Sequence, residues 1–274
     1  MEHPNAENIW DWKNPLRVAL ILTNYNMPER TDALVEYIRD NCMWPVDYYV
    51  VDNASDLIHR ANYTSVYLEA NKQTCGGWLA GLNNAREWVE ITNFPPYFAY
   101  WIMITSAEFL PGSGDVLTPM CEFLIENPEA VAIHPALTKD STTTWSHMLS
   151  IGGDEPRRTF MVDNIAALYR ADWFDSIGWF DPELTYAWGV DLESCWKARS
   201  QGKSIWIDER VRVKKVTDIG YKMERMNMSA DSRFKLAADE AQRVLSIKYG
   251  GDFLNKLRYE YTEDEWLGTY PGRV

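Results

Sequence analysis

The stretch Arg17-Val-Ala-Leu-Ile-Leu-Thr23, which continues into Asn24-Tyr25-Asn26, gives the first indication of the fold. An uninterrupted apolar run of this length is typical of a strand buried on both faces, as in a parallel sheet. The Asn residues end the run, and apolar residues then recur with helical spacing over residues 31–40. The sequence therefore predicts a buried strand followed by a helix, which is the beginning of a βαβ unit.

The same alternation of strand and helix continues along the N-terminal part of the chain, which predicts an α/β fold with right-handed crossovers. Strands are predicted at residues 47–51, 65–69 and 97–104, and a helix at residues 78–89. Further along, the pattern predicts helices at 116–126, 191–200 and 229–249, and strands at 131–134, 164–170 and 204–213.

Polar residues follow three of these strands, at Thr23-Asn24, at Asp52-Asn53 and at residues 105–108. In open α/β sheets, ligands bind outside the carboxyl ends of the strands. Each segment alone is also typical of a plain turn, because Asn, Asp and Ser favour turns. Three such segments on one edge of a sheet favour a binding site there.

Charge and composition restrict the possible partners. The formal net charge of −13 argues against binding to nucleic acid, which needs a basic surface. An anionic ligand would need a local positive centre, either a metal ion or a few basic side chains. The four cysteines are far apart and form no CxxC pair, so we expect free thiols and a cytoplasmic location. No apolar run approaches the length of a transmembrane segment.

Six blocks of sequence occur in an order that is known from one family. They are residues 18–26, 50–55, 71–81, 105–108, 177–182 and 188–191. This set resembles the inverting family-2 glycosyltransferases of the GT-A fold, and the likeness covers residues 16–216. It implies a GT-A type, Rossmann-like mixed sheet flanked by helices, with a glycosyltransferase domain at 1–220 and a packed C-terminal helical extension at 221–274.

The resemblance also implies an activity. The protein would move a sugar from a nucleotide-diphosphate donor, built on UDP, GDP or dTDP, to a hydroxyl of a glycan or other acceptor, with inversion. Asp52 would bond the nucleobase, since a carboxylate accepts hydrogen bonds from a ring N–H; its other interpretation is an Asx-turn cap. The residues implied on the donor side are Thr23, Asn24, Tyr25, Asp52, Asn53, Asn71, Gly76, Gly77, Thr105 and Ser106. The two glycines would let the backbone approach the ligand at a helix N-terminus.

The metal-binding motif of the family falls at Thr105-Ser106-Ala107-Glu108, where Ser106 replaces the first expected carboxylate. In addition, Lys214 and Lys215 stand where an imidazole ligand is common. We therefore expect weak dependence on a divalent cation, with Mg²⁺ or Mn²⁺ loosely held by Glu108. The alternative is that a Lys ammonium beside the β-phosphate supplies the charge itself.

The late acidic block implies that Asp191 is the general base, with Glu193 behind it and with Trp188 and Gly189 beneath the acceptor. The alternative is that Asp191 has a structural role only, as a carboxylate at a helix N-terminus that interacts with the helix dipole.

Competing functions are separated by motifs. A nucleotidyltransferase usually has a Gly-rich loop with Lys or Arg after the first strand, and a Rossmann oxidoreductase has GxGxxG there; residues 24–27 contain neither. A degenerate GT-A domain that binds a sugar or a protein without catalysis stays open, because Ser106, Gly189 and Lys215 depart from the family pattern.

Overall fold

The structure, a computed structural model, describes residues 15–216 and 229–263. Its strands are β1 Val18–Asn24, β2 Val46–Asp52, β3 Val66–Tyr67, β4 Ala99–Ile104, β5 Ala107–Phe109, β6 Ala130–Leu137, β7 Pro156–Thr159, β8 Ala166–Arg170 and β9 Ser204–Lys215. Its helices are α1 Pro28–Asn41, α2 Gln73–Thr92, α3 Thr118–Glu126, α4 Ala171–Ser176, α5 Val190–Ser200, α6 Ala230–Tyr249 and α7 Phe253–Tyr259, with short 3₁₀ turns η2 Leu57–His59 and η3 Ser146–Met148.

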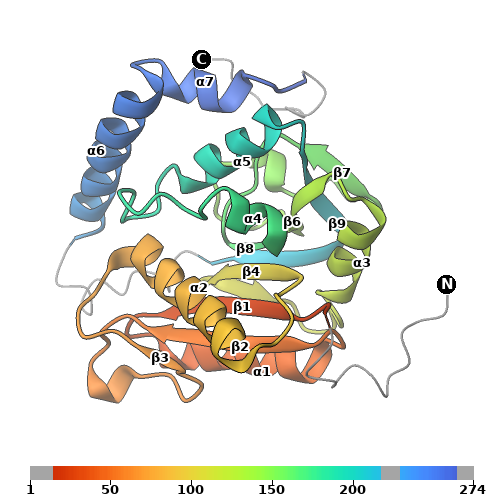
Figure 1. The fold of residues 1–274 in the computed structure, drawn as a ribbon, viewed down its shortest axis with the longest axis vertical. Coiled ribbons are helices and arrows are strands. Elements are labelled where there is room, and N and C mark those ends of the chain that lie inside the picture. Colours follow the sequence, from red (N-terminus) through yellow and green to blue (C-terminus); the bar gives the residue numbers. More distant parts are fainter. Residues whose placement is uncertain (1–14, 217–228, 264–274) are drawn as a thin grey trace.

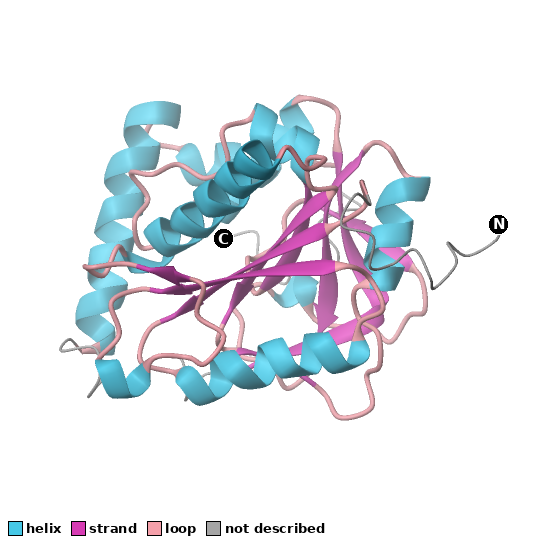
Figure 2. Cartoon of the chain, turned by 60° about the horizontal axis from the view of Figure 1, so that its bottom comes forward, coloured by secondary structure: helices cyan, strands magenta, loops and turns pink. Residues whose placement is uncertain are grey.

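Within these residues, nine strands form one mixed sheet in the order β3-β2-β1-β4-β8-β6-β9-β5, with β7 paired to β9. Helices lie on both sides of the sheet (Figure 2). β1 is almost entirely buried and runs parallel to β2 and β4, as its apolar sequence predicts.

The direction of the strands decides which segments share an edge. β8 runs antiparallel to β4 and to β6, and β9 runs parallel to β6. The start of β8 therefore lies at the same edge as the ends of β1, β2, β4 and β9. We call this edge, with residues 23–24, 52–53, 104–106, 163–165 and 215–216, the carboxyl edge.

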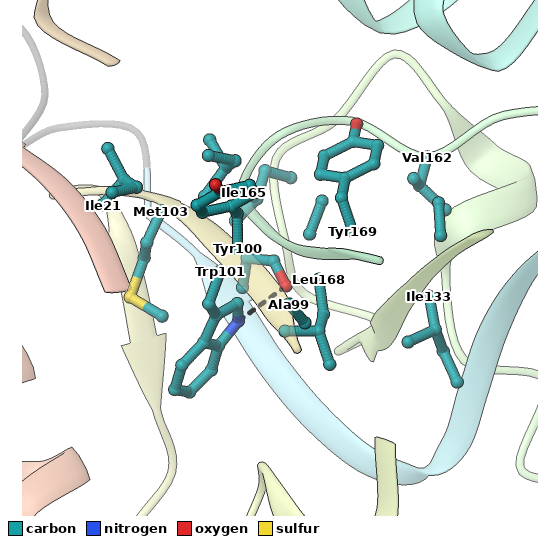
Figure 3. Packing of buried hydrophobic residues seen from close by; sticks show 14 of the residues in the cluster. Ile21, Ala99, Tyr100, Trp101, Met103, Ile133, Val162, Ile165, Leu168 and Tyr169 are labelled. Atoms are coloured by element: carbon teal, nitrogen blue, oxygen red, sulfur yellow. Dashed lines mark hydrogen bonds between the residues drawn. The ribbon is translucent and has the colours of Figure 1, made fainter. Parts of the chain in front are cut away.

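Aromatic side chains join the strands in the core. Trp101 of β4 is fully buried, and its Nε1 donates to the carbonyl oxygen of Ala166 in β8 at 3.0 Å (Figure 3). Because an indole N–H must find a partner when buried, this bond fixes the register between the two strands at the carboxyl edge.

Helix α2 lies unusually close to β1. A Cβ atom added at Gly77 would lie 2.7 Å from Thr23 Cγ2, and one at Gly81 would lie 2.7 Å from Ile21 Cγ2. The helix begins at Gln73, before the predicted start, so Gly76 and Gly77 lie inside it. Their N–H groups are used by the helix itself. Gly77 thus serves the close packing of α2 on Thr23, and an approach of either glycine to a donor stays a prediction.

The C-terminal helices α6 and α7 pack against the part of the molecule that contains α5 (Figure 1). Tyr249 donates its hydroxyl to Glu193 Oε1 at 2.7 Å, and Thr185 donates to Glu240 Oε2 at 2.6 Å. The side chains of Phe253 and Leu257 are buried. The boundary predicted at residue 220 lies outside the described residues, and the division into two parts stays a prediction. Among the helices of the described ranges, none is long and apolar enough to cross a membrane.

Candidate functional site

Asn24, at the end of β1, is completely buried and is the centre of a hydrogen-bond network. Its Nδ2 donates to Asp52 Oδ2 at 3.1 Å, Ser55 Oγ at 3.2 Å and the carbonyl oxygen of His59 at 3.0 Å. Its Oδ1 accepts from Met27 N at 3.0 Å and from Thr31 Oγ1 at 3.2 Å. The side chain therefore holds together the segments that follow β1 and β2.

The carboxylate of Asp52 is fixed in the same network and is only 1% exposed. Besides the bond from Asn24, its Oδ1 accepts from Ser55 N at 2.9 Å, which is an Asx-type turn. Asn53 donates to Asn71 Oδ1 at 3.2 Å and to the carbonyl oxygen of Gln73 at 2.9 Å. The structure thus joins Asp52 to Asn24 and Asn53 to Asn71, and a contact between Asp52 and a nucleobase stays a prediction.

The remaining donor-side residues line the same edge. The Thr23 hydroxyl is buried against Gly77 and has no hydrogen-bond partner among the described residues. Tyr25 is partly buried, and Thr105 Oγ1 lies 3.8 Å from Met27 Sδ. Their contacts with a donor stay predictions.

The expected metal site does not fit the residues that are present. Glu108 Oε2 lies 3.0 Å from Arg30 Nη1, so a guanidinium already balances its charge. Ser106 contributes its carbonyl oxygen to the backbone of Val216 at 2.9 Å. No group of three or more His, Cys, Asp or Glu side chains suited to a metal ion occurs in residues 15–216 and 229–263. Glu108 therefore lacks the second and third ligands that a protein-built site needs.

The two lysines at the end of β9 point to opposite sides of the sheet, as successive strand residues do. Lys214 forms an ion pair with Asp140, whose side chain is largely exposed. Lys215 Nζ lies 3.2 Å from Asp163 Oδ2, and these two side chains are 27% and 23% exposed. Only Lys215 is thus joined to the segment that precedes β8.

Asp191 lies in the first turn of α5 and is 8% exposed. Among the described residues, backbone N–H groups donate to its carboxylate, and that of Leu192 lies 2.9 Å from Oδ1. Burial, and next the negative charge of Asp163, raise the pKa of Asp191 to about 7, while Lys215 acts in the opposite direction. Asp163, Asp191 and Lys215 together form what we call the Asp191 cluster.

The other acidic residues near α5 have a different role. Residues two apart on a helix do not face the same side, and Glu193 accordingly turns toward α6, where its Oε1 accepts from Tyr249. Asp181 forms an ion pair with Lys248 of α6. Both carboxylates anchor the C-terminal helix, which leaves Asp191 as the candidate base.

Trp188 and Gly189 precede the helix. Gly189 has φ +88°, and a Cβ atom there would lie 2.6 Å from Leu245 Cδ1 of α6. The positive φ therefore favours glycine at this position, and a larger residue would also have to displace the end of the Leu245 side chain. Trp188 is 43% exposed, with its ring centroid 5.8 Å from that of Phe234. An acceptor-side role for the two residues stays a prediction.

Asp163 is the site residue that the sequence patterns missed. It follows an apolar segment and precedes Asn164, whose Oδ1 accepts from Tyr169 at 2.7 Å. Below it, His134 Nε2 accepts from Ala166 N at 3.0 Å, which fixes the start of β8. Burial lowers the pKa of His134 to about 4, so this imidazole is neutral at pH 7. The signal in the sequence was an acidic residue directly before a predicted strand.

Comparison with known proteins supports the fold. No model of a known protein family matches the chain, and no curated protein matches it. The crystal structure of GalNAc-T7 with UDP, GalNAc and Mn²⁺ is similar, with 12% identity, a TM-score of 0.59, and coverage of 93% of this chain and 56% of that chain. The mannosyltransferase PcManGT from Pyrobaculum calidifontis, in complex with GDP-Man and Mn²⁺, has 14% identity, a TM-score of 0.48, and coverage of 89% and 70%.

At this identity the likeness concerns the fold. The chain has a GT-A type fold, with a mixed nine-stranded sheet flanked by helices, and the expected fold class is confirmed. The chain spans little more than half the length of the GalNAc-T7 chain, with 56% covered. Activity, donor and acceptor are therefore matters for proposal.

Proposed function

We propose that the protein is a glycosyltransferase that moves a sugar from a nucleotide-diphosphate donor to an acceptor hydroxyl with inversion. The observation that carries the proposal is Asp191. It is a buried carboxylate in the first turn of α5, near enough to Asp163 and Lys215 of the carboxyl edge for their charges to act on it, and burial raises its pKa to about 7. A general base works best when its pKa lies near the working pH, and such shifts are typical of catalytic groups.

The proposed proton transfer needs a carboxylate oxygen that is not already paired. Asp163 is already bound to Lys215, whereas Asp191 Oδ2 has no hydrogen bond from the described residues. Asp191 would accept the proton of the acceptor hydroxyl while that oxygen attacks the anomeric carbon. The bond from the anomeric carbon to the diphosphate oxygen breaks on the opposite face, and the nucleoside diphosphate leaves with the electron pair. A single displacement of this kind inverts the anomeric centre.

The donor would lie along the carboxyl edge, with its base toward Thr23, Tyr25 and Asp52. UDP, GDP and dTDP are the candidate nucleotides, and GalNAc-T7 was solved with UDP. The charge of the leaving diphosphate needs a fixed cation nearby. Because Glu108 is paired with Arg30 at 3.0 Å, no step of this mechanism is assigned to a metal ion.

A second candidate is a GT-A domain that binds a nucleotide or sugar without catalysis. It is favoured by the internal hydrogen bonds of Asn24 and Asp52, which occupy groups predicted to face the donor.

The test begins with binding. UDP, GDP and dTDP are titrated into the full chain by calorimetry and thermal shift, and a ligand at 100 times its Kd should stabilise the fold by about 2.7 kcal/mol. UDP-, GDP- and dTDP-sugars are then tested for donor hydrolysis, and the anomer of the released sugar is read by NMR. Inverted product supports the proposal. Binding without turnover favours the non-catalytic candidate, and no binding of any nucleotide overturns both.

A further inference from the structure

We infer that the ammonium group of Lys215, positioned by Asp163, binds the donor diphosphate and supplies the positive charge that GT-A sites take from a divalent cation. The inference rests on the proposed function, and it names the source of the charge at that same site.

The first argument is the state of the carboxylates near the end of β4. Ser106 has no carboxylate, and Glu108 Oε2 is held by Arg30 at 3.0 Å. Two other nitrogens of Arg30, Nε and Nη2, are already buried without a hydrogen-bond partner among the described residues. A cation on Glu108 would compete with Arg30 for that carboxylate, and displacement of Arg30 would remove the bond from its Nη1 as well.

The second argument is the place of Lys215. β9 pairs with β5 so that Lys215 lies opposite Ala107, and Val216 N donates to the carbonyl oxygen of Ser106 at 2.9 Å. The lysine therefore lies directly beside the turn in which the family has its metal motif. Its own backbone is fixed, since its N–H donates to Ser141 Oγ at 3.0 Å.

The third argument is the number of donors. An ammonium group has three N–H donors. In residues 15–216 and 229–263, Lys215 Nζ makes one hydrogen bond, to Asp163 at 3.2 Å. Two donors are left for phosphate oxygens, and about a quarter of the side chain is exposed. Lysine binds phosphate as a point charge in this way.

The fourth argument is the role that Asp163 then takes. A single ammonium lies among two carboxylates, Asp163 and Asp191. Its contact with Asp163 at 3.2 Å keeps it from pairing with Asp191, where it would make that carboxylate a poorer base. Asp163 is thus a positioning residue that separates the cation for the leaving group from the base for the acceptor.

Lys214 provides a matched control on the same strand. It is adjacent to Lys215 but points to the other side, where it lies opposite Glu108 of β5, and it forms an ion pair with Asp140. The arrangement predicts that removal of its charge leaves diphosphate binding nearly unchanged.

The experiment is calorimetry of UDP and GDP with the full chain, in EDTA and in Mn²⁺. We expect the same affinity in both within about threefold, a loss of about tenfold or more in Lys215→Met, and recovery in Lys215→Arg. Lys214→Met should bind within about threefold of the unaltered chain. Circular dichroism melts confirm that each variant is folded.

The outcomes separate the two proposals. Binding that appears only with Mn²⁺, or Lys215→Met binding that equals that of the unaltered chain, overturns the role of Lys215 and leaves the glycosyltransferase proposal intact. Equal losses in Lys214→Met and Lys215→Met would also overturn it, because they indicate a general charge effect. Absence of UDP and GDP binding under both conditions, together with absence of dTDP binding in the titrations described above, counts against the proposed function itself.

Discussion

The two halves of the carboxyl edge are built from similar residues but in different ways. At the ends of β1 and β2, Asn24, Asp52 and Asn53 are buried, and Asn24 bonds the side chain of Asp52 and the backbone N–H of Asn53. At the start of β8 and the end of β9, Asp163 and Lys215 stay about a quarter exposed. Asp191 lies beside them with one carboxylate oxygen unpaired among the described residues. A polar residue at a strand end therefore does not by itself mark a ligand site, and its hydrogen-bond partners must be counted.

The difference is one of stability against reactivity. Satisfied buried amides and carboxylates stabilise the fold, whereas a buried carboxylate with few partners has a raised pKa and is available to take a proton. In the first half, Asn24 is expected to respond to substitution through the free energy of unfolding, and Asp52 is the residue there for which we also predict a ligand contact. The second half is expected to respond through rate and binding.

The largest effect is expected for Asp191→Asn. The amide keeps the shape but cannot accept the proton, so the transfer rate should fall by about 10² or more with nucleotide affinity nearly unchanged. Kinetics with a donor found in the screen measure this. Glu193→Gln is the control, since Glu193 bonds Tyr249 of α6 at 2.7 Å; it should lower the melting temperature and leave the rate near normal. Normal turnover in Asp191→Asn would show that Asp191 is not the general base.

The same variant should also change how the free energy of unfolding depends on pH. The folded-state pKa of Asp191 is raised to about 7 from the ordinary 3.8. Its contribution to stability is therefore fully present below the unfolded pKa and is lost as the pH rises toward 7. Asp191→Asn lacks this loss, so denaturant unfolding should show the variant gaining on the unaltered chain between about pH 4 and pH 7.

The next effect concerns Asn24. Asn24→Ala removes five hydrogen bonds and leaves Met27 N and the carbonyl oxygen of His59 without partners. We expect a loss of about 3 kcal/mol in the free energy of unfolding, measured in urea. Asp163→Asn is the comparison from the other half, and its partly exposed ion pair predicts a loss under about 1 kcal/mol. Similar losses in the two variants would contradict the contrast between the halves.

A smaller effect is expected for Asp52→Asn. The amide oxygen can keep the bond from Ser55 N, but the amide NH₂ cannot accept from Asn24 Nδ2 and the side chain loses acceptor strength toward a base N–H. Nucleotide affinity should weaken by about tenfold, which is about 1.4 kcal/mol, when measured by calorimetry well below the melting temperature. Unchanged affinity would assign Asp52 to the Asx turn alone and complete the contrast between the two halves.

The sequence predicted the fold because local patterns carry it. The apolar run of β1 and the strand–helix alternation depend on residues that are close together in the chain. The position of Asp191 at the start of a helix was predicted for a similar reason, since its block of sequence opens α5. The role of Glu193 was not predicted, because it depends on the packing of α6 against α5.

Contacts between distant segments could not be predicted. The bond from Arg30 to Glu108 joins residues 78 positions apart, and nothing in either segment indicates the other. Asp163 was missed because the sequence pattern of a strand does not indicate whether it runs parallel or antiparallel to its neighbours. Only the antiparallel pairing of β8 with β4 brings the start of β8 to the carboxyl edge.

The smallest predicted effect is a shift in pH dependence. The acid limb of the rate profile should report Asp191, because three other titratable groups nearby, Cys195, Tyr169 and His134, are neutral there. Burial raises the pKa of Cys195 to about 12 and that of Tyr169 well above its usual value. His134, which lies near Asp163, has a pKa lowered to about 4 by burial. The limb should thus lie near pH 7, with the rate rising as Asp191 loses its proton.

Asp163→Asn should move that limb to lower pH. The substitution removes the negative charge that helps to raise the pKa of Asp191, and it frees Lys215 to approach, so both changes favour the ionised base. Lys215→Met should move the limb the other way, since it removes the one positive charge that opposes the shift. The measurement is the midpoint of kcat/KM against pH, which does not depend on the height of the plateau. If the two variants shifted in the same direction, or if neither shifted, the Asp191 cluster would not act as a unit, and the second half of the edge would be no more reactive than the first.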